Sequence, residues 1–297
     1  MFIYFHARKN PLDFSLRYIE KFLTSFPAKS FSEHQFRKLF DTQKDEWHIP
    51  SHKQANDVIN YLTKKGKLQL NYFSDDDHQN KKIYAWKTEN EFTIISAVKS
   101  DSYYVYYTSM FLHELTLQIP KTIYLNYEHT PQIELNNSAN ISQESIDKAF
   151  SGTQRKSLKM LSFQDKKIVI TNGKYTNRLG VVYRKNENEY FAYTDIERTL
   201  IDISVRPVYS GGVFEVLEAY KNAKSKVDVN KLAVYLKELN YIYPYNQVIG
   251  FYLEKAGYGD EGVDLFRNKI EFNFYLTYGI RNKEFSEEWR LFYPKGF

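Results

Sequence analysis

The sequence lacks cysteine, long apolar runs and the glycine-rich loops that hold nucleotides. Because none of its 297 residues is cysteine, disulfides, thiolate metal sites and cysteine nucleophiles are excluded. No apolar run approaches the roughly 20 residues that a membrane-spanning helix needs. The first residues show no basic start followed by an apolar core, which is the pattern of a secretory signal. We therefore expect a cytoplasmic protein with no membrane contact.

Motifs for catalysis and for metal or cofactor binding are also missing. The seven histidines include no H-E-x-x-H spacing, and no G-x-S-x-G, G-x-x-x-x-G-K-[ST] or G-x-G-x-x-G segment occurs. Asp165 and Lys167 with Glu187 or Glu189 leave a metal-dependent nuclease as a third alternative, although their spacing matches no compact nuclease pattern. The prediction is that the protein is not an enzyme and has no catalytic residues, metal or cofactor.

The sequence is rich in apolar and aromatic residues, and its positive charge is unevenly distributed. Hydrophobic residues make up 42% and aromatic residues 17%, enough for a folded core. Residues 1–90 carry 15 Lys and Arg against 11 Asp and Glu, an excess of four, whereas the other 207 residues carry 26 against 25. A polyanion such as DNA is therefore expected to bind the first third of the chain.

The first ninety residues contain three helix-like segments followed by two short strand-like runs. Ser32 and Gln35 form a capping box for the second helix, Ser51 is expected to cap the third, and Gly66 to end it. The expected helices span about residues 12–26, 33–40 and 51–65, and the strands 67–73 and 82–86. This order is that of a winged helix-turn-helix.

The pattern changes near residues 90–100, where we place a domain boundary. The remaining chain predicts a small mixed or antiparallel sheet from strands at 122–127, 167–171, 181–184 and 190–193, with several packed helices. The expected fold class is α+β: an N-terminal winged helix-turn-helix over residues 1–90, followed by a larger mixed α/β C-terminal domain over residues 91–297.

The third expected helix has one apolar face and one polar face. Ala55, Val58, Ile59 and Leu62 share the first. Lys53, Asn56, Asn60 and Lys64 lie within an arc of about 80° on the opposite side. Asparagine can pair with adenine and lysine with guanine or phosphate, so this helix is the expected reader of the major groove. The predicted DNA-contacting residues are Ser51, Lys53, Asn56, Asn60, Lys64, Lys65, Lys81 and Lys82.

Two observations keep other interpretations of this helix open. An ordinary solvated helix face has the same pattern. Asp57 lies beside the polar stripe, and Asp75, Asp76 and Asp77 occupy the turn between the two strands, where phosphates would repel them.

The segment Tyr193–Lys224 predicts two amphipathic helices joined by a corner. Thr194 with Glu197 forms an expected capping box, and Pro207 ends the first helix. Gly211-Gly212 follows a helix instead of a strand, so it favours a corner over a phosphate-binding loop. Arg198 is four residues before Asp202, the spacing of an ion pair across one helical turn.

Two segments of the chain resemble AbiEi-type antitoxins of abortive-infection type IV toxin–antitoxin systems. The first is Ser102–Glu128, with the order S-x-x-x-x-H-x-L-t-x-Q-x-P, and the second joins Thr194–Asp202 to Gly211-Gly212. The resemblance covers roughly residues 100–257. It implies a transcriptional autorepressor that binds double-stranded promoter DNA at inverted repeats. It also implies an antitoxin that counters a nucleotidyltransferase-like toxin and needs no stable complex with it.

The resemblance and the polar helix face give the same leading hypothesis, a DNA-binding autorepressor that is also an antitoxin. The acidic turn departs from what such a family needs at DNA, and residues after about 260 have no counterpart in the resemblance. The alternative is a protein-interaction module in which the N-terminal domain is a scaffold without DNA binding.

Overall fold

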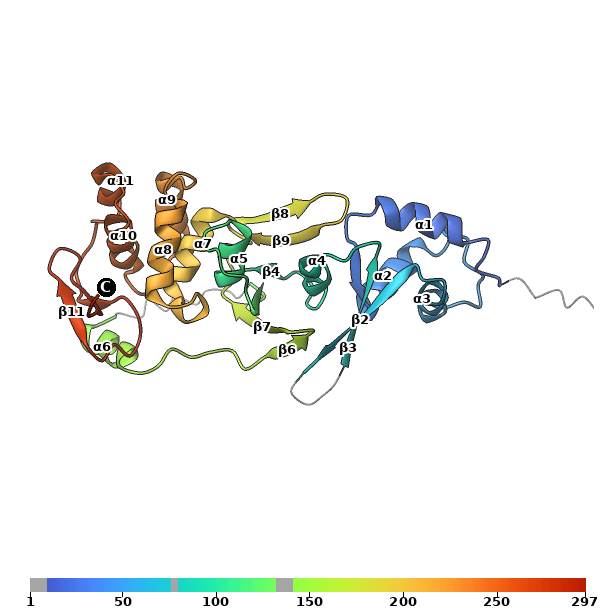
Figure 1. Ribbon diagram of the computed structural model, residues 1–297, viewed down its shortest axis with the longest axis horizontal. Helices are drawn as coiled ribbons and strands as arrows, with labels where there is room; N and C mark the ends of the chain where they lie inside the picture. The colour runs from blue at the N-terminus through green and yellow to red at the C-terminus, as the bar shows by residue number, and fades with distance from the viewer. Residues whose placement is uncertain (1–9, 76–79, 132–140) are drawn as a thin grey trace, which may run out of the picture. The chain divides into compact units, whose positions relative to one another are not determined.

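The computed structural model describes residues 10–75, 80–131 and 141–297, which fall into two compact units (Figure 1). The N-terminal unit comprises Met1–Asp101 together with Tyr183–Phe191, and the C-terminal unit comprises Ser102–Val182 and Ala192–Phe297. The division into domains of residues 1–90 and 91–297 stays a prediction.

The N-terminal unit packs three helices against a strand hairpin. Strands β2 and β3 pair antiparallel from Leu68 opposite Trp86 to Ser74 opposite Asn80, and β1 pairs with the other edge of β3. Its elements are α1 (Leu16–Ser25), β1 (Ser30–Ser32), α2 (Glu33–Gln43), α3 (Ala55–Lys64), β2 (Leu68–Ser74), β3 (Asn80–Trp86) and α4 (Glu91–Ser96). Apolar side chains from all three long helices and from β3 form its buried core, among them Ile19, Phe36, Val58, Leu62 and Trp86.

Local signals explain most helix ends in this unit, with one correction. The capping box of Ser32 and Gln35 at α2 is confirmed. The predicted cap Ser51 is wrong: α3 begins at Ala55, and Gln54 and Asp57 form its capping box. Gly66 has φ +68°, the left-handed conformation that ends a helix, so the predicted stop is confirmed.

The C-terminal unit combines strands, a helical layer and a small second sheet (Figure 1). Parts of strands β8 and β9, within residues 183–191, belong to the N-terminal unit. The elements up to the helical layer are β4 (Tyr103–Tyr104), α5 (Tyr106–Leu112), β5 (Thr122–Glu128), α6 (Gln143–Ser151), β6 (Met160–Phe163), β7 (Lys166–Gly173), β8 (Val181–Lys185) and β9 (Tyr190–Thr194). They are followed by α7 (Ile196–Val205), η1 (Pro207–Tyr209), α8 (Val213–Ala223), α9 (Val229–Leu239), α10 (Tyr245–Lys255), α11 (Asp260–Asp264), β10 (Phe274–Tyr275), β11 (Lys283–Ser286) and β12 (Leu291–Pro294).

The predicted fold class is wrong. The strands form one nine-stranded sheet in the order β1-β3-β2-β6-β7-β5-β4-β9-β8 and a separate three-stranded sheet in the order β10-β12-β11. The strands of the expected winged helix-turn-helix belong to this large sheet, and the first described helix begins only at Leu16. The error has a physical reason: local patterns predict that strands exist, but not which distant strands pair.

Residues after 260, which have no counterpart in the antitoxin resemblance, complete the core of the C-terminal unit. Trp289 is fully buried, and its indole N–H donates to a carboxylate oxygen of Glu254 on α10 at 2.7 Å. A Cβ built on Gly250 would lie 2.2 Å from the Trp289 ring, so only glycine permits this approach. The small sheet therefore stabilises α10 from outside the helical layer.

The corner between α7 and α8 matches the sequence prediction. Gly211 and Gly212 have φ of +81° and +95°, and Gly212 is the residue before α8. The chain reaches them through η1, which begins at Pro207. Both glycines therefore serve the turn. No helix in the described part of the chain is long and apolar enough to cross a membrane.

Candidate nucleic-acid interface

Helix α3 presents a polar stripe to solvent. Asn56, Asn60 and Lys64 are exposed and follow one another at four-residue spacing. Val58 and Leu62 on the opposite side are fully buried. The core therefore fixes the rotation of the helix about its axis, and this rotation brings the two amides and the ammonium group together on one face.

The other predicted contact residues lie before α3, at its end or on β3. Ser51 and Lys53 precede α3 and are not helical, and the Lys53 ammonium lies 3.9 Å from Asp57. Lys65 pairs with Asp13 at 3.4 Å. Lys82 is exposed on β3, whereas Lys81 donates to the Val98 carbonyl.

The carboxylate of Asp57, which lies beside the stripe, opposes DNA binding less than the sequence suggested. Asp57 accepts the backbone N–H of Gln54 at 2.8 Å, so its charge faces the start of the helix. A carboxylate at this position also interacts favourably with the helix dipole. Asp76 and Asp77, which DNA phosphates would repel, lie outside the described residues.

A hydrogen bond from Tyr61 joins α3 to the start of α1. The Tyr61 hydroxyl donates to a carboxylate oxygen of Asp13 at 2.6 Å. Burial and the bond to Asp13 raise the pKa of Tyr61 to about 12. The bond to Tyr61 lowers the pKa of Asp13, and Lys65 adds to that shift.

These shifts predict how stability depends on pH. Because the folded-state pKa of Tyr61 is raised, its contribution is complete below pH 10 and is lost as the pH rises towards about 12. Tyr61→Phe should therefore flatten the loss of stability between these pH values. Denaturant titrations of both proteins at pH 8 and pH 11 measure the change. An equal loss in both proteins would contradict the assignment.

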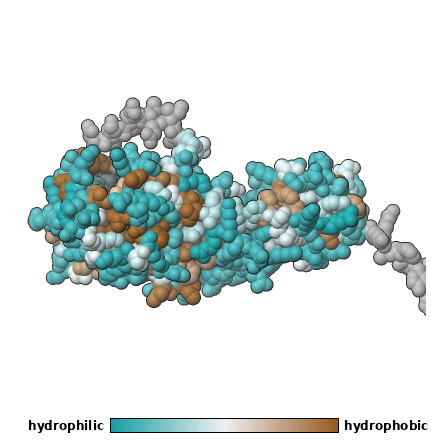
Figure 2. Space-filling model, turned by 90° about the horizontal axis from the view of Figure 1, so that it is seen from above, coloured by the Kyte–Doolittle hydropathy of each residue, from teal (hydrophilic) through white to brown (hydrophobic). Residues whose placement is uncertain are grey.

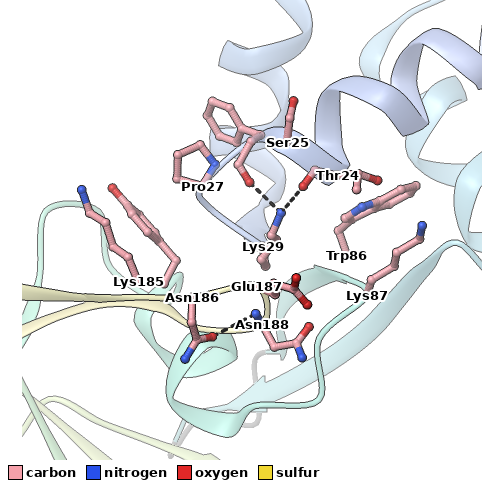
Figure 3. Close-up of a pocket in the computed structure, with 12 residues that line it drawn as sticks. Thr24, Ser25, Pro27, Lys29, Trp86, Lys87, Lys185, Asn186, Glu187 and Asn188 are labelled. Carbon is pink, nitrogen blue, oxygen red and sulfur yellow. Dashed lines mark hydrogen bonds between the residues drawn. The ribbon is translucent and has the colours of Figure 1, made fainter.

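A cavity of about 640 Å³ lies in the same unit (Figure 3). The buried Lys29 donates to the carbonyls of Thr24 and Phe26 at the end of α1, at 2.7 and 2.8 Å. The ammonium groups of Lys87 and Lys185 lie over aromatic rings. These lysines are engaged with the protein itself, so we assign no ligand to this cavity.

The turn between β8 and β9 is a part of this unit that sequence reasoning missed. The hydroxyl of Thr88 donates to the Asn188 carbonyl at 2.8 Å, and the amide of Asn90 donates to Glu189 at 2.8 Å. These residues are about 100 positions apart, and no local pattern could have indicated the contact.

The segment that carries the antitoxin resemblance forms a buried polar cluster in the C-terminal unit. The predicted pair is confirmed: Arg198 Nε donates to Asp202 Oδ1 at 2.9 Å, with both side chains almost fully buried. The predicted capping box of Thr194 and Glu197 is wrong, because Asp195 caps α7 and Thr194 bonds Thr199. Burial raises the pKa of Asp202, although Arg198 opposes the shift.

Side chains from the other segment of the resemblance, Ser102–Glu128, and from Thr176 complete this cluster. Glu128 accepts from the hydroxyls of Thr176 and Tyr103, and Asn126 donates to the Tyr103 hydroxyl at 2.9 Å. Arg198 in turn donates to Thr176 Oγ1 at 3.3 Å. Within residues 10–75, 80–131 and 141–297, no group of three or more His, Cys, Asp or Glu side chains could hold a metal ion.

Comparison with known proteins gives a likeness in fold only. No family model matches the chain, and no curated protein matches it. One similar solved structure is the RV2827C protein from Mycobacterium tuberculosis, with a TM-score of 0.52 and 11% sequence identity. The match covers 96% of this chain and 92% of that chain, so the two folds are alike over nearly their whole length.

Proposed function

We propose that the chain is a DNA-binding transcriptional autorepressor that acts as the antitoxin of a type IV toxin–antitoxin system. The observation that carries the DNA-binding part is the exposed stripe of Asn56, Asn60 and Lys64 on a helix whose opposite face is buried. Its ligand is double-stranded promoter DNA.

The stripe offers two kinds of contact with DNA. The amides of Asn56 and Asn60 suit the N6 and N7 edge of adenine, which only the major groove presents in a distinct pattern. Lys64 suits a phosphate or guanine, and Lys82 is a further exposed cation in the same unit. Base contacts would supply sequence preference, and cations would supply affinity and orientation.

The antitoxin part of the proposal rests on the resemblance of Ser102–Glu128 and Thr194–Asp202 to AbiEi-type antitoxins. A nucleotidyltransferase-like toxin gene beside this one would be the expected target. Co-expression of the two genes should restore the growth that the toxin alone arrests. Unrelieved arrest in the presence of the folded protein would exclude the antitoxin role.

A gel-shift titration with the promoter of its own gene tests the DNA-binding part. Binding should weaken steeply as salt rises, because each neutralised phosphate releases counterions. A scrambled duplex of equal composition should bind more weakly. Absence of binding to either duplex at low salt would exclude the proposal.

Lys64→Ala should weaken binding to promoter and scrambled DNA by similar factors. The slope of log Kobs against log salt should fall by about 0.9, the value for one lost phosphate contact. Lys21→Ala is the matched control, because Lys21 is an exposed lysine on α1 of the same unit, away from the α3 stripe. An equal change in slope for both variants would mean that only net charge matters.

The alternative is a protein-interaction module, and one observation favours it. Figure 2 shows apolar side chains at the surface of the C-terminal unit, and Leu117, Leu158 and Ile119 are 97%, 86% and 76% exposed. Contiguous apolar patches mark protein-binding surfaces, whereas single exposed apolar residues are ordinary. A tightly co-purifying protein together with no DNA affinity would favour this alternative.

A further inference from the structure

A small cavity of about 160 Å³ lies at the end of α7 in the C-terminal unit. Its lining combines apolar residues such as Val105, Val205 and Leu239 with polar groups, several of which belong to the buried cluster around Arg198 and Asp202. Those that matter for its chemistry are Asn126, Lys174, Arg198, Asp202 and Arg206. Neither the proposed DNA contact nor the corner of the fold makes use of this cavity.

One carboxylate oxygen at this cavity is without a partner. Asp202 is only 6% exposed. Its Oδ1 accepts from Arg198 at 2.9 Å, whereas its Oδ2 is buried and has no hydrogen-bond partner among the described residues. Buried polar atoms are bonded as a rule, so an unused acceptor indicates a donor that these residues do not supply.

Arg198 cannot rotate to supply that donor. Its Nη1 donates to the Leu179 carbonyl at 2.8 Å and to Thr176 at 3.3 Å, while its Nε holds Asp202 Oδ1. Thr176 is itself fixed by the carboxylate of Glu128. The guanidinium is therefore locked in one orientation, and Oδ2 remains available.

The charges that line the cavity favour an anion. Arg198, Arg206 and Lys174 contribute three cations, and Asp202 contributes the single carboxylate. Asp195 and Glu128 are near, but Asp195 pairs with Lys231 at 2.9 Å and Glu128 holds Thr176. A ligand that fits must therefore present negatively charged atoms to the cations, and it must also carry a proton that it can donate to Asp202.

We propose that this cavity binds a phosphate group that retains one proton, either as inorganic phosphate or as a small phosphate monoester. The unprotonated oxygens would accept from Arg206, whose Nη1 otherwise donates to the Arg155 carbonyl at 3.3 Å, and the P–O–H group would donate to Asp202 Oδ2. At about 30 Å³ for each water molecule, the cavity volume corresponds to about five waters. This is room for a five-atom ion but not for a nucleoside.

Sulfate distinguishes this site from a general anion site. It has the size and shape of phosphate but carries no proton at neutral pH, so one of its oxygens would face the Asp202 carboxylate and be repelled. Isothermal titration of the full chain at pH 7 and constant ionic strength should show phosphate binding at least about tenfold tighter than sulfate, the equivalent of one charge-assisted hydrogen bond. Equal affinities, or no binding of phosphate, would overturn the proposal.

The variant Asp202→Asn tests the role of the carboxylate. An amide can donate to a fully ionised oxyanion, so this variant should bind sulfate as well as it binds phosphate. Retained preference for phosphate would overturn the proposal.

A second variant keeps the test valid if Asp202→Asn does not fold. Arg206→Gln, at a half-buried position on the rim of the cluster, should weaken phosphate binding by about tenfold. Arg281→Gln, at an exposed position outside the cavity lining, is the matched control and should bind as the unchanged chain does. Equal weakening in both variants would overturn the proposal.

A third ligand identifies the source of the phosphate. At pH 6, where about half of a monoester retains its second proton, tighter binding of methyl phosphate than of inorganic phosphate would identify a monoester, and the reverse would identify the free ion. Rejection of both in favour of sulfate would overturn the proposal. Because the site lies in the C-terminal unit, its failure would leave the DNA-binding proposal for α3 untouched.

Discussion

Replacement of both Asn56 and Asn60 by alanine should remove most of the sequence preference of DNA binding without unfolding the protein. Each bidentate contact between an asparagine and adenine discriminates by about 1–3 kcal/mol. At 1.4 kcal/mol for each factor of ten, the loss is about tenfold to a hundredfold for each contact. Both side chains are exposed, so the free energy of unfolding should change by less than about 0.5 kcal/mol.

Competition between promoter and scrambled duplexes measures this preference directly. Gln69→Ala is a suitable control, because Gln69 is an exposed amide on β2 of the same unit and does not belong to the α3 stripe. The control should keep the full preference. A double variant that still prefers its promoter as the unchanged chain does would show that α3 is not the helix that contacts bases.

Replacement of Arg198 by alanine should lower the free energy of unfolding of the C-terminal unit by about 3–5 kcal/mol, the cost of leaving a buried charge without its partner. The side chains of Arg198 and Asp202 are each 7% exposed, so the pair is largely shielded from bulk solvent. The change also removes the bonds that Arg198 donates to Leu179 and Thr176. Urea unfolding followed by circular dichroism measures the difference.

The double variant Arg198→Met with Asp202→Leu separates the cost of the unpaired charge from the cost of the other contacts that are lost. Apolar residues of similar size often replace a buried ion pair at little cost. The double variant should therefore recover much of the stability that the single variant loses. A single variant that costs less than about 1 kcal/mol would mean that the pair is solvated or that Asp202 takes up a proton.

Local signals predicted several features correctly. The capping box of Ser32 and Gln35, the stop at Gly66, the Arg198–Asp202 pair and the Gly211-Gly212 corner each depend on residues only a few positions apart. The start of α7 was missed by one residue. Thr194 and Asp195 can both cap a helix, and what decides between them is the buried bond of Thr194 to Thr199.

The sheet was not predictable in the same way. Strands β5 and β7 pair in parallel, with Thr122 opposite Lys167, and nothing in either run indicates its partner. The β8–β9 turn joins the N-terminal unit through contacts such as that between Thr88 and Asn188. Element order in the first ninety residues therefore predicted a winged helix-turn-helix, a fold class that the nine-stranded sheet contradicts.

The two candidate sites also differ in whether the sequence alone could predict them. The stripe on α3 lies on one helix, so a periodicity of 3.6 residues was enough to find it. The C-terminal cluster joins α7 to Tyr103, Asn126 and Glu128, which are about 70–100 positions earlier in the chain. No spacing rule connects these residues, and only the packed structure brings them together.

Photo-crosslinking from α3 tests the central claim most directly. A photoreactive amino acid in place of Asn60, in the full chain bound to its own promoter, should crosslink to the DNA. The same amino acid in place of Val234, which is 52% exposed on α9, serves as the control and should not crosslink. DNA crosslinking from Asn60 alone is the result that this account predicts. Crosslinking from neither position, with DNA bound, would contradict it.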